Sequence, residues 1–238
     1  MTGASSVDDH RGDPASPSDA LPSNVDLTCR DRARAPVVQR VLTLAASALW
    51  LVLVATGMTL LFRYAGTPGA AGEPPGSWPV ESTIGPTPGR ATIVMLAHPH
   101  CPCTRASIAE LAVLMSRIAD RASAHVLFMR PSQLGEGWEK SELWQAAARI
   151  PGVTVHSDVE GAEAKRFSAS TSGQTIVYDE AGRLIFRGGI TISRGHQGDN
   201  AGLQRIISLV TRDRADGHDS PVYGCPLGDP GGAERMQL

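Results

Sequence analysis

The feature that most limits what this chain can fold into is an apolar run from Val41 to Phe62, which contains no charged residue over 22 positions. A helix of this length reaches roughly 33 Å, enough to cross the ~30 Å hydrocarbon core of a bilayer. The run also exceeds the ~7–15-residue apolar region of a signal peptide. We therefore predict a transmembrane anchor over residues 38–63, with removal as a signal peptide as the alternative.

Positive charge is distributed unevenly about this predicted anchor. Four arginines lie shortly before the run, namely Arg30, Arg32, Arg34 and Arg40, whereas only Arg63 follows it closely. Because lysine and arginine gather on the cytoplasmic side of a membrane, we expect a cytoplasmic N-terminus. The C-terminal part of this single-pass protein is then expected outside the cytoplasm.

The rest of the chain divides by composition. Residues 1–37 are rich in Ser, Pro, Asp and Gly, which predicts a disordered cytoplasmic tail. Residues 64–90 are expected to form a Gly/Pro-rich linker, residues 91–212 a folded domain, and residues 213–238 a C-terminal tail that carries Cys225. The formal net charge of −2 and the lack of a basic stripe give no reason to expect nucleic acid as a partner.

Strand-like and helix-like segments alternate in the expected domain. Buried strands are predicted over 91–97, 124–130 and 153–158, and helices over 108–119, 138–150 and within 161–169. The stretch "QTIVYDEAGRLIFRGG" contains two β-rich runs split by a turn, which predicts a hairpin. A closing helix contains Leu203 to Val210, with Asp199 or Asn200 as its N-cap. This order predicts an α/β fold, a mixed sheet with helices on both faces.

The cysteines carry the candidate chemistry. Cys29 falls in the predicted cytoplasmic tail, where disulfides are rarely kept. Cys101, Cys103 and Cys225 fall on the outer side. Three cysteines cannot all pair within one chain, so at least one of them has another role.

The segment "HPHCPCT" places two of these cysteines between a predicted strand and a predicted helix. With Pro102 in the first helical turn, Cys101 is expected at the helix N-cap. There the unpaired backbone N–H groups and the positive end of the helix dipole favour a thiolate. His98 and His100 are expected to add positive charge or accept a proton.

The element order, the position of "HPHCPCT" and the hairpin "DEAGRLIFRGGI" together resemble the thioredoxin-like superfamily, over about Ala91 to Thr211. The likeness is closest to membrane-anchored bacterial members that face the periplasm, of the RedB type. It implies a thioredoxin-like fold and a location in the bacterial inner membrane with a periplasmic domain. The family usually separates its two cysteines by two residues, whereas Cys101 and Cys103 are separated by one. The family also has a cis-proline before the hairpin, where this chain has Ser172-Gly173.

The resemblance and the cysteines together predict a membrane-anchored periplasmic thiol–disulfide oxidoreductase with no cofactor. Cys101 would be the attacking thiol, Cys103 would resolve the mixed disulfide, and His100 would tune the thiolate. A disulfide across one intervening residue is strained, so it should be oxidising; reaction with Cys225 as a resolving thiol is the alternative. The expected partners are extracytoplasmic protein thiols or a membrane redox partner.

A metal site can be built from the same segment. Thiolate and imidazole together suit Cu(I) or Zn, so the alternative function is an extracytoplasmic copper chaperone of thioredoxin-like fold. Its candidate ligands are Cys101, Cys103, His98, His100 and His196, the last from the loop after the hairpin. No Ser-His-Asp set, phosphate loop or paired carboxylates in a recognisable context supports a hydrolase.

Overall fold

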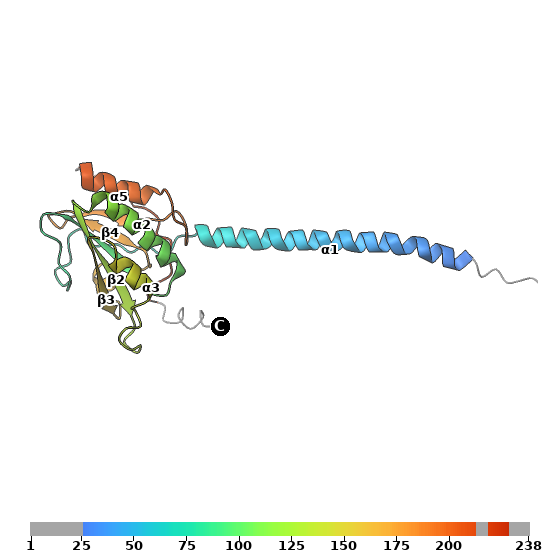
Figure 1. Cartoon of the computed structure of the whole chain (residues 1–238), viewed down its shortest axis with the longest axis horizontal. Coiled ribbons are helices and arrows are strands. Elements are labelled where there is room, and N and C mark those ends of the chain that lie inside the picture. Colours follow the sequence, from blue (N-terminus) through green and yellow to red (C-terminus); the bar gives the residue numbers. More distant parts are fainter. Residues whose placement is uncertain (1–25, 213–218, 229–238) are drawn as a thin grey trace, which may run out of the picture. The chain divides into compact units, whose positions relative to one another are not determined.

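The computed structural model describes residues 26–212 and 219–228. The predicted disordered tail over residues 1–37 lies mostly outside the described residues, but residues 26–37 are helical. They belong to helix α1, Asp26–Gly66, which is drawn as one long coil in Figure 1. The chain up to Thr56 and the compact unit from Gly57 onward are separate bodies and are described separately.

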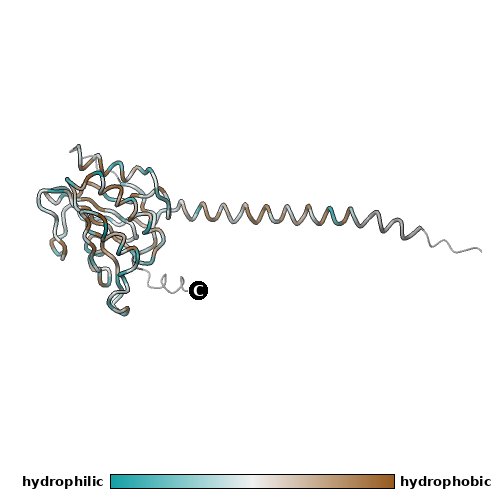
Figure 2. The backbone as a smooth tube through the Cα atoms, in the orientation of Figure 1, coloured by the Kyte–Doolittle hydropathy of each residue, from teal (hydrophilic) through white to brown (hydrophobic). Residues whose placement is uncertain are grey.

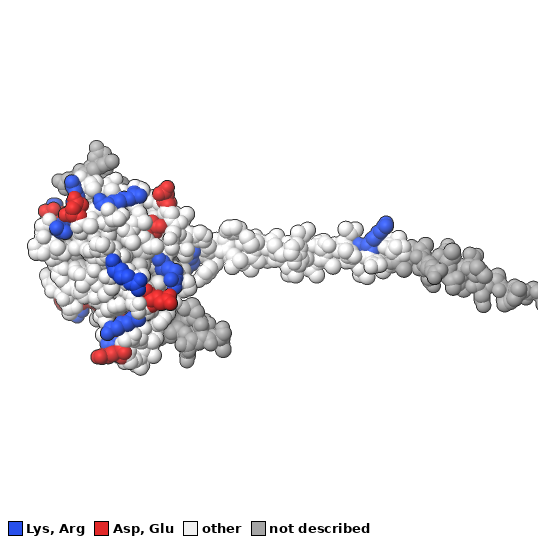
Figure 3. Space-filling view, viewed as in Figure 1, with Lys and Arg blue, Asp and Glu red and all other residues white. Residues whose placement is uncertain are grey.

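Helix α1 contains the one candidate membrane span among the described residues. Its segment Pro36–Gly66 has a mean hydropathy of 2.1, and none of it is buried against other parts of the chain. Apolar residues recur along the segment Pro36–Gly66 in Figure 2, and Figure 3 shows charged side chains gathered over the domain but rare along this segment. Length and composition therefore suit a membrane anchor, as the sequence predicted.

The domain is built on a five-stranded mixed sheet in the order β3-β2-β1-β4-β5. The strands are β1 Ala91–Ala97, β2 Ala122–Arg130, β3 Val153–Val159, β4 Thr175–Tyr178 and β5 Leu184–Gly188. β1, β2 and β3 run parallel, whereas β4 is antiparallel to β1 and β5 is antiparallel to β4. The predicted mixed sheet and hairpin are thus confirmed, and the fold is thioredoxin-like. Every residue of β1 is buried because this central strand is covered on both faces.

Helices cover the two faces of the sheet unequally. Helices α2 (Pro102–Ile118), α3 (Glu142–Ala148) and α5 (Ala201–Arg212) lie on one face, as Figure 1 shows, and pack on Ile93 and Met95 of β1. The short helix α4, Ala162–Arg166, lies on the other face, which is formed in part by Val94 and Leu96. The alternation of side chains along β1 thus divides its residues between two apolar cores.

The starts of α5 and α3 show how the local sequence determines where a helix begins. The side chain of Asn200 accepts a hydrogen bond of 2.7 Å from the backbone N–H of Leu203, which confirms Asn200 as the N-cap of α5. Helix α3 begins at Glu142, later than the predicted 138, because residues 137–140 form a turn in which Lys140 N–H bonds to Gly137 O.

The predicted linker over residues 64–90 packs against the domain. Trp78 makes edge-on ring contacts with Phe167 and Tyr178, at centroid distances of 5.2 and 5.1 Å. Ile84 is buried in the same apolar core as Leu96. Beyond the end of α1 at Gly66, residues 67–90 follow the domain surface without helix or strand, and two of their apolar side chains complete the second core.

Candidate redox site

The candidate site lies where the central strand gives way to the first helix of the domain. β1 ends at Ala97, and Cys101 is the N-cap of α2 with an extended backbone (φ −86°, ψ 122°). Pro102 occupies the first helical turn, where its missing N–H costs no hydrogen bond. The predicted N-cap position of Cys101 is confirmed.

Three sulfur atoms meet at this point. Cys101 and Cys103 are buried, Cys225 is half-buried, and all three are free thiols. The Sγ atoms of Cys101 and Cys225 lie 3.0 Å apart, and the three Sγ atoms lie within 4.8 Å of one another. Among the residues whose side chains the structure describes, 36–211 and 219–228, no other three His, Cys, Asp or Glu residues bring potential ligand atoms so close.

Cys225 reaches the site because residues 219–228, which we call the C-terminal strap, pack on the domain. The strap runs antiparallel to the segment before β4: Thr171 forms a β-bridge with Pro226, Ser172 N–H donates to Cys225 O at 2.8 Å, and Leu227 N–H donates to Ser170 O at 2.9 Å. The remaining parts of residues 213–238, predicted to be a C-terminal tail, lie outside the described residues. The strap itself forms one wall of the site.

Further contacts hold the strap on both sides of Cys225. Its buried side chains are those of Val222 and Leu227, the latter within the second core. The strap makes these additional hydrogen bonds: Ser220 Oγ to Gly189 O at 2.7 Å, Gly69 N–H to Val222 O at 2.8 Å, and the Arg194 guanidinium to Gly224 O. The Asp219 carboxylate pairs with Arg187 at 2.7 Å. The position of Cys225 is therefore fixed from both neighbouring sides.

The three thiols share one negative charge unequally. Hydrogen bonds from Cys103 and Cys225 lower the pKa of Cys101 far below its ordinary value, and the backbone N–H of Thr104 adds to this, while burial opposes it. The same interaction with Cys101 raises the pKa values of Cys103 and Cys225. Cys101 is therefore the thiolate, and the other two sulfurs keep their protons.

Ser172 connects the parts of the site. It lies in the segment before β4, and its Oγ accepts a hydrogen bond of 2.8 Å from the backbone N–H of His98. The same Oγ lies 2.7 Å from Thr104 Oγ1, and the Ser172 N–H holds the strap. The sequence shows that no proline precedes this strand, but it assigns no role to Ser172. The contacts of Ser172 are with His98, Thr104 and Cys225, which are all distant from it in the sequence.

The two histidines before Cys101 lie beside the sulfur cluster and outside it. His98 is buried, and its Nδ1 accepts the backbone N–H of His100 at 3.2 Å. The exposed His100 ring lies against Trp138, with a centroid distance of 4.6 Å and its Nε2 3.2 Å from Trp138 O. Burial lowers the pKa of His98, although the negative charge of Cys101 acts to raise it. His98 is thus the histidine that interacts electrostatically with the thiolate, and tuning by His100 stays a prediction.

His196 is exposed in the loop between β5 and α5, with its Nδ1 2.9 Å from Arg194 O. The structure does not bring it to the sulfur cluster. The neighbouring Arg194 does approach the site: the hydrogen bond with Cys101 raises the pKa of Cys103, the charge of Arg194 opposes this rise, and its guanidinium donates to the strap at Gly224 O. The sequence drew attention to this loop through His196, but Arg194 is the residue that acts on the thiols.

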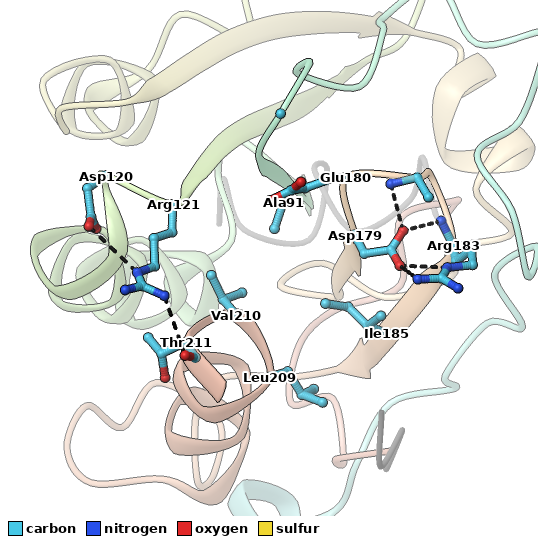
Figure 4. Close-up of a pocket in the computed structure, with 12 residues that line it drawn as sticks. Ala91, Asp120, Arg121, Asp179, Glu180, Arg183, Ile185, Leu209, Val210 and Thr211 are labelled. Atoms are coloured by element: carbon cyan, nitrogen blue, oxygen red, sulfur yellow. Dashed lines mark hydrogen bonds and ion pairs between the residues drawn. The ribbon is translucent and has the colours of Figure 1, made fainter. Parts of the chain in front are cut away.

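A cavity of about 500 Å³ lies at the other end of the sheet, shown in Figure 4. Ala91, the first residue of β1, lines it, whereas the cysteines follow the last residue of that strand. Four of the charged residues that line it form ion pairs, Arg121 with Asp120 and Arg183 with Asp179. None of its lining residues is a cysteine or a histidine, so it contributes nothing to the thiol site.

Solved structures show counterparts of this fold. An uncharacterized conserved protein from Geobacillus kaustophilus has a TM-score of 0.51 and 18% identity, over 69% of this chain and 94% of that protein. A hypothetical protein from Sinorhizobium meliloti 1021 has a TM-score of 0.50 and 16% identity, over 68% and 94% of the two chains. At these identities the likeness shows a shared fold.

Thioredoxin-like disulfide oxidoreductases are also among the structural neighbours. A secreted disulfide oxidoreductase from Mycobacterium tuberculosis has a TM-score of 0.36 and 11% identity, over 52% of this chain and 81% of that one. This likeness is too distant to carry an argument about activity. No protein-family model matches the chain, and no curated protein matches it in sequence.

Proposed function

We propose that this protein is a membrane-anchored thiol–disulfide oxidoreductase that acts on protein thiols outside the cytoplasm. The observation that carries the proposal is the position of Cys101, a buried cysteine at a helix N-terminus with a second cysteine Sγ only 3.0 Å away. A thiolate is the species that attacks a disulfide, and a nearby thiol completes the exchange.

In this proposal Cys101 attacks a client disulfide and forms a mixed disulfide, which a second cysteine of the chain then resolves. The sequence assigns that second role to Cys103, with Cys225 as the alternative. Both keep their protons beside the Cys101 thiolate, because its negative charge raises their pKa values. The chemistry needs no bound cofactor, since the electrons move between sulfur atoms.

The proposed location follows from α1 and the charges around it. The apolar segment Pro36–Gly66 would cross the membrane, with the arginine-rich side in the cytoplasm and the domain outside, as in RedB-type proteins. An extracytoplasmic compartment suits a cysteine site that forms a disulfide during its reaction. The proposed partners are protein thiols in that compartment, or a redox protein of the membrane.

The test uses the full chain purified in detergent. The reduced protein is mixed with a fluorescent peptide that contains a disulfide, and peptide reduction is followed together with the oxidation of the protein. The reduction potential is then measured in glutathione buffers. We expect stoichiometric exchange that requires Cys101. A protein that leaves the peptide disulfide intact at every glutathione ratio would overturn the proposal.

A second candidate function is supported by the same cluster, because three sulfurs within 4.8 Å of one another can bind a soft ion such as Cu(I). The cluster supplies Cys225 as the third donor, in place of the histidines that the sequence predicted. This candidate is tested by titrating the reduced chain with Cu(I) against a competing chelator. Stoichiometric Cu(I) binding that Cys225→Ser weakens, without disulfide exchange, would favour a copper-binding protein over an oxidoreductase.

A further inference from the structure

We infer that Cys225 is the resolving cysteine, so that the oxidised protein carries a disulfide between Cys101 and Cys225. This inference rests on the proposed function and assigns the second catalytic residue within it. It departs from the pairing suggested by the sequence, in which Cys103 follows Cys101 after one residue. Three observations carry it: the sulfur positions, the geometry of the helix start, and the anchoring of the strap.

The sulfur positions favour Cys225. Its Sγ lies 3.0 Å from that of Cys101 across 124 positions of sequence. Disulfide bond formation requires one sulfur to approach another to about 2 Å, so a further displacement of about 1 Å is enough. Residues this far apart in the chain close a large ring, which leaves both side chains free to adopt the torsion that a disulfide requires.

The helix start disfavours Cys103. Cys101 is the N-cap of α2 and Cys103 is the second residue inside the helix. The Sγ atoms of Cys101 and Cys103 lie within 4.8 Å of each other, but a disulfide across a single intervening residue is strained. A bond between them would have to distort the first turn of α2, in which Thr104 N–H donates to Cys101 O at 3.0 Å.

The strap presents Cys225 in a fixed position because Gly224 lies flat against the chain before β4. A Cβ atom added at Gly224 would lie 1.8 Å from Ser172 O, so no other residue fits without moving the strap. Arg194 donates to the carbonyl of the same glycine. By contrast, Gly228 at the end of the strap has open space where its Cβ would lie.

The proposed reaction balances within the chain and its client. The Cys101 thiolate attacks one sulfur of a client disulfide, forms a mixed disulfide and releases the first client thiolate. Cys225, after losing its proton, attacks Cys101 Sγ and releases the second client thiolate. Two electrons pass from Cys101 and Cys225 to the client; Cys225 supplies one proton to the client sulfurs and solvent water supplies the second. The reverse sequence oxidises a client dithiol.

The test maps the disulfide in the full chain, purified in detergent with Cys29→Ser in every variant. The reduced protein is treated with oxidised glutathione, quenched in acid, alkylated and digested with trypsin. Cleavage after arginine places Cys101 and Cys103 in one peptide, 91–105, and Cys225 in another, 215–235. We expect these two peptides to be linked, with the alkyl label on Cys103. A 91–105 peptide with both its cysteines joined and Cys225 alkylated would overturn the inference.

Kinetics of the same reaction separate this inference from the proposed function. In Cys225→Ser the mixed disulfide at Cys101 should accumulate and resolve about 100-fold more slowly, because a positioned intramolecular thiol has been lost. In Cys103→Ser the link between Cys101 and Cys225 should still form. If Cys103→Ser traps the mixed disulfide and Cys225→Ser does not, the inference fails while the proposed function stands. If Cys101 never reacts with glutathione disulfide, the proposed function fails as well.

A matched pair of glycine variants tests the part played by the strap. Gly224→Ala displaces the strap through the contact with Ser172 O, whereas Gly228→Ala adds the same methyl group in open space. We expect Gly224→Ala to slow resolution about 10-fold while Cys101 still attacks glutathione disulfide at its normal rate, and Gly228→Ala to change neither step. Equal resolution rates in the two variants would contradict a positioned Cys225.

Discussion

Two pairs of like side chains lie at hydrogen-bonding distance in this domain, and their surroundings give them opposite properties. The Sγ atoms of Cys101 and Cys225 are 3.0 Å apart, and His125 Nδ1 and His156 Nε2 are 2.9 Å apart. The cysteines meet at a helix N-terminus, and hydrogen bonds from Cys103 and Cys225, with smaller contributions from backbone N–H groups, lower the pKa of Cys101. The histidines face each other from β2 and β3, where burial lowers both pKa values and keeps the rings neutral.

The comparison teaches that proximity alone does not make a reactive pair. Two neighbouring groups that share a proton become reactive only where the surrounding dipoles stabilise the charged form of one of them. The cysteine pair has backbone N–H groups for that purpose, whereas burial is the main influence on the histidine pair. We therefore expect the cysteine pair to govern activity and the histidine pair to govern stability in acid.

The largest expected effect is on activity, from Cys101→Ser. This variant removes the thiolate that attacks the client, so disulfide exchange should fall by about 1,000-fold or more. Reduction of a disulfide-containing peptide by the full chain in detergent measures it. His125→Phe is the matched comparison from the other pair and should keep the exchange rate. If disulfide exchange survives Cys101→Ser, the expectation that the cysteine pair governs activity is wrong.

The next effect concerns acid stability. The pKa of His125 is lowered to about 4, first by burial and then by His156. Between the ordinary histidine pKa of about 6.5 and this value, the unfolded chain binds more protons than the folded one, so stability falls as the pH falls. The loss attributable to His125 should be roughly 2 kcal/mol across this window.

The measurement is urea unfolding of the full chain in detergent at several pH values, followed by near-ultraviolet circular dichroism. His125→Phe should flatten the decline in unfolding free energy below pH 6.5, whereas His196→Gln, in an exposed loop, should leave the decline unchanged. A decline of the same size in both variants would mean that other groups cause the acid sensitivity.

A smaller effect is expected in the reactivity of Cys101 with iodoacetamide. Because its pKa is lowered, Cys101 should keep reacting as the pH falls below the ordinary thiol pKa of about 8.5, and slow only near its own pKa. At pH 6 it should react about 10-fold faster than glutathione, after allowing for the weaker nucleophilicity of a low-pKa thiolate. Mass spectrometry of the 91–105 peptide gives the rate. A tenfold decrease in rate for each unit below pH 8.5, as in the urea-unfolded chain, would contradict a stabilised thiolate.

The smallest effect is expected from Ser172→Ala, which tests which contacts hold the two cysteines in position. The variant removes the Oγ contacts with His98 N–H and Thr104 but keeps the backbone N–H that holds Cys225. The free energy of unfolding should fall by about 1 kcal/mol. Ser116→Ala, on the exposed side of α2, is the control and should cost less. A loss of several kcal/mol would mean that the side chain, and not the strand-like backbone pairing, holds the site together.

Much of the fold could be predicted from the sequence, because local patterns specify local structure. The unbroken apolar run of β1 and the turn at Asp179–Gly182 were sufficient to predict a central buried strand and a hairpin, and the structure confirms both. Helix α3 was predicted too long because side-chain periodicity does not reveal a turn that ends just before it. The contacts of residues 64–90 with the domain were not predicted, since they depend on residues such as Phe167 and Tyr178 that are distant in the sequence.

The candidate site likewise has some features that the local sequence specifies and others that depend on distant segments. By itself, the sequence determined that Cys101 caps a helix after a strand, because both neighbouring elements and Pro102 are local features. Only the tertiary structure decided which groups surround that sulfur. It brought Cys225 and Ser172 to it and kept His196 away. The physical reason is that those positions depend on backbone pairing between segments far apart in the chain, which no spacing within one segment encodes.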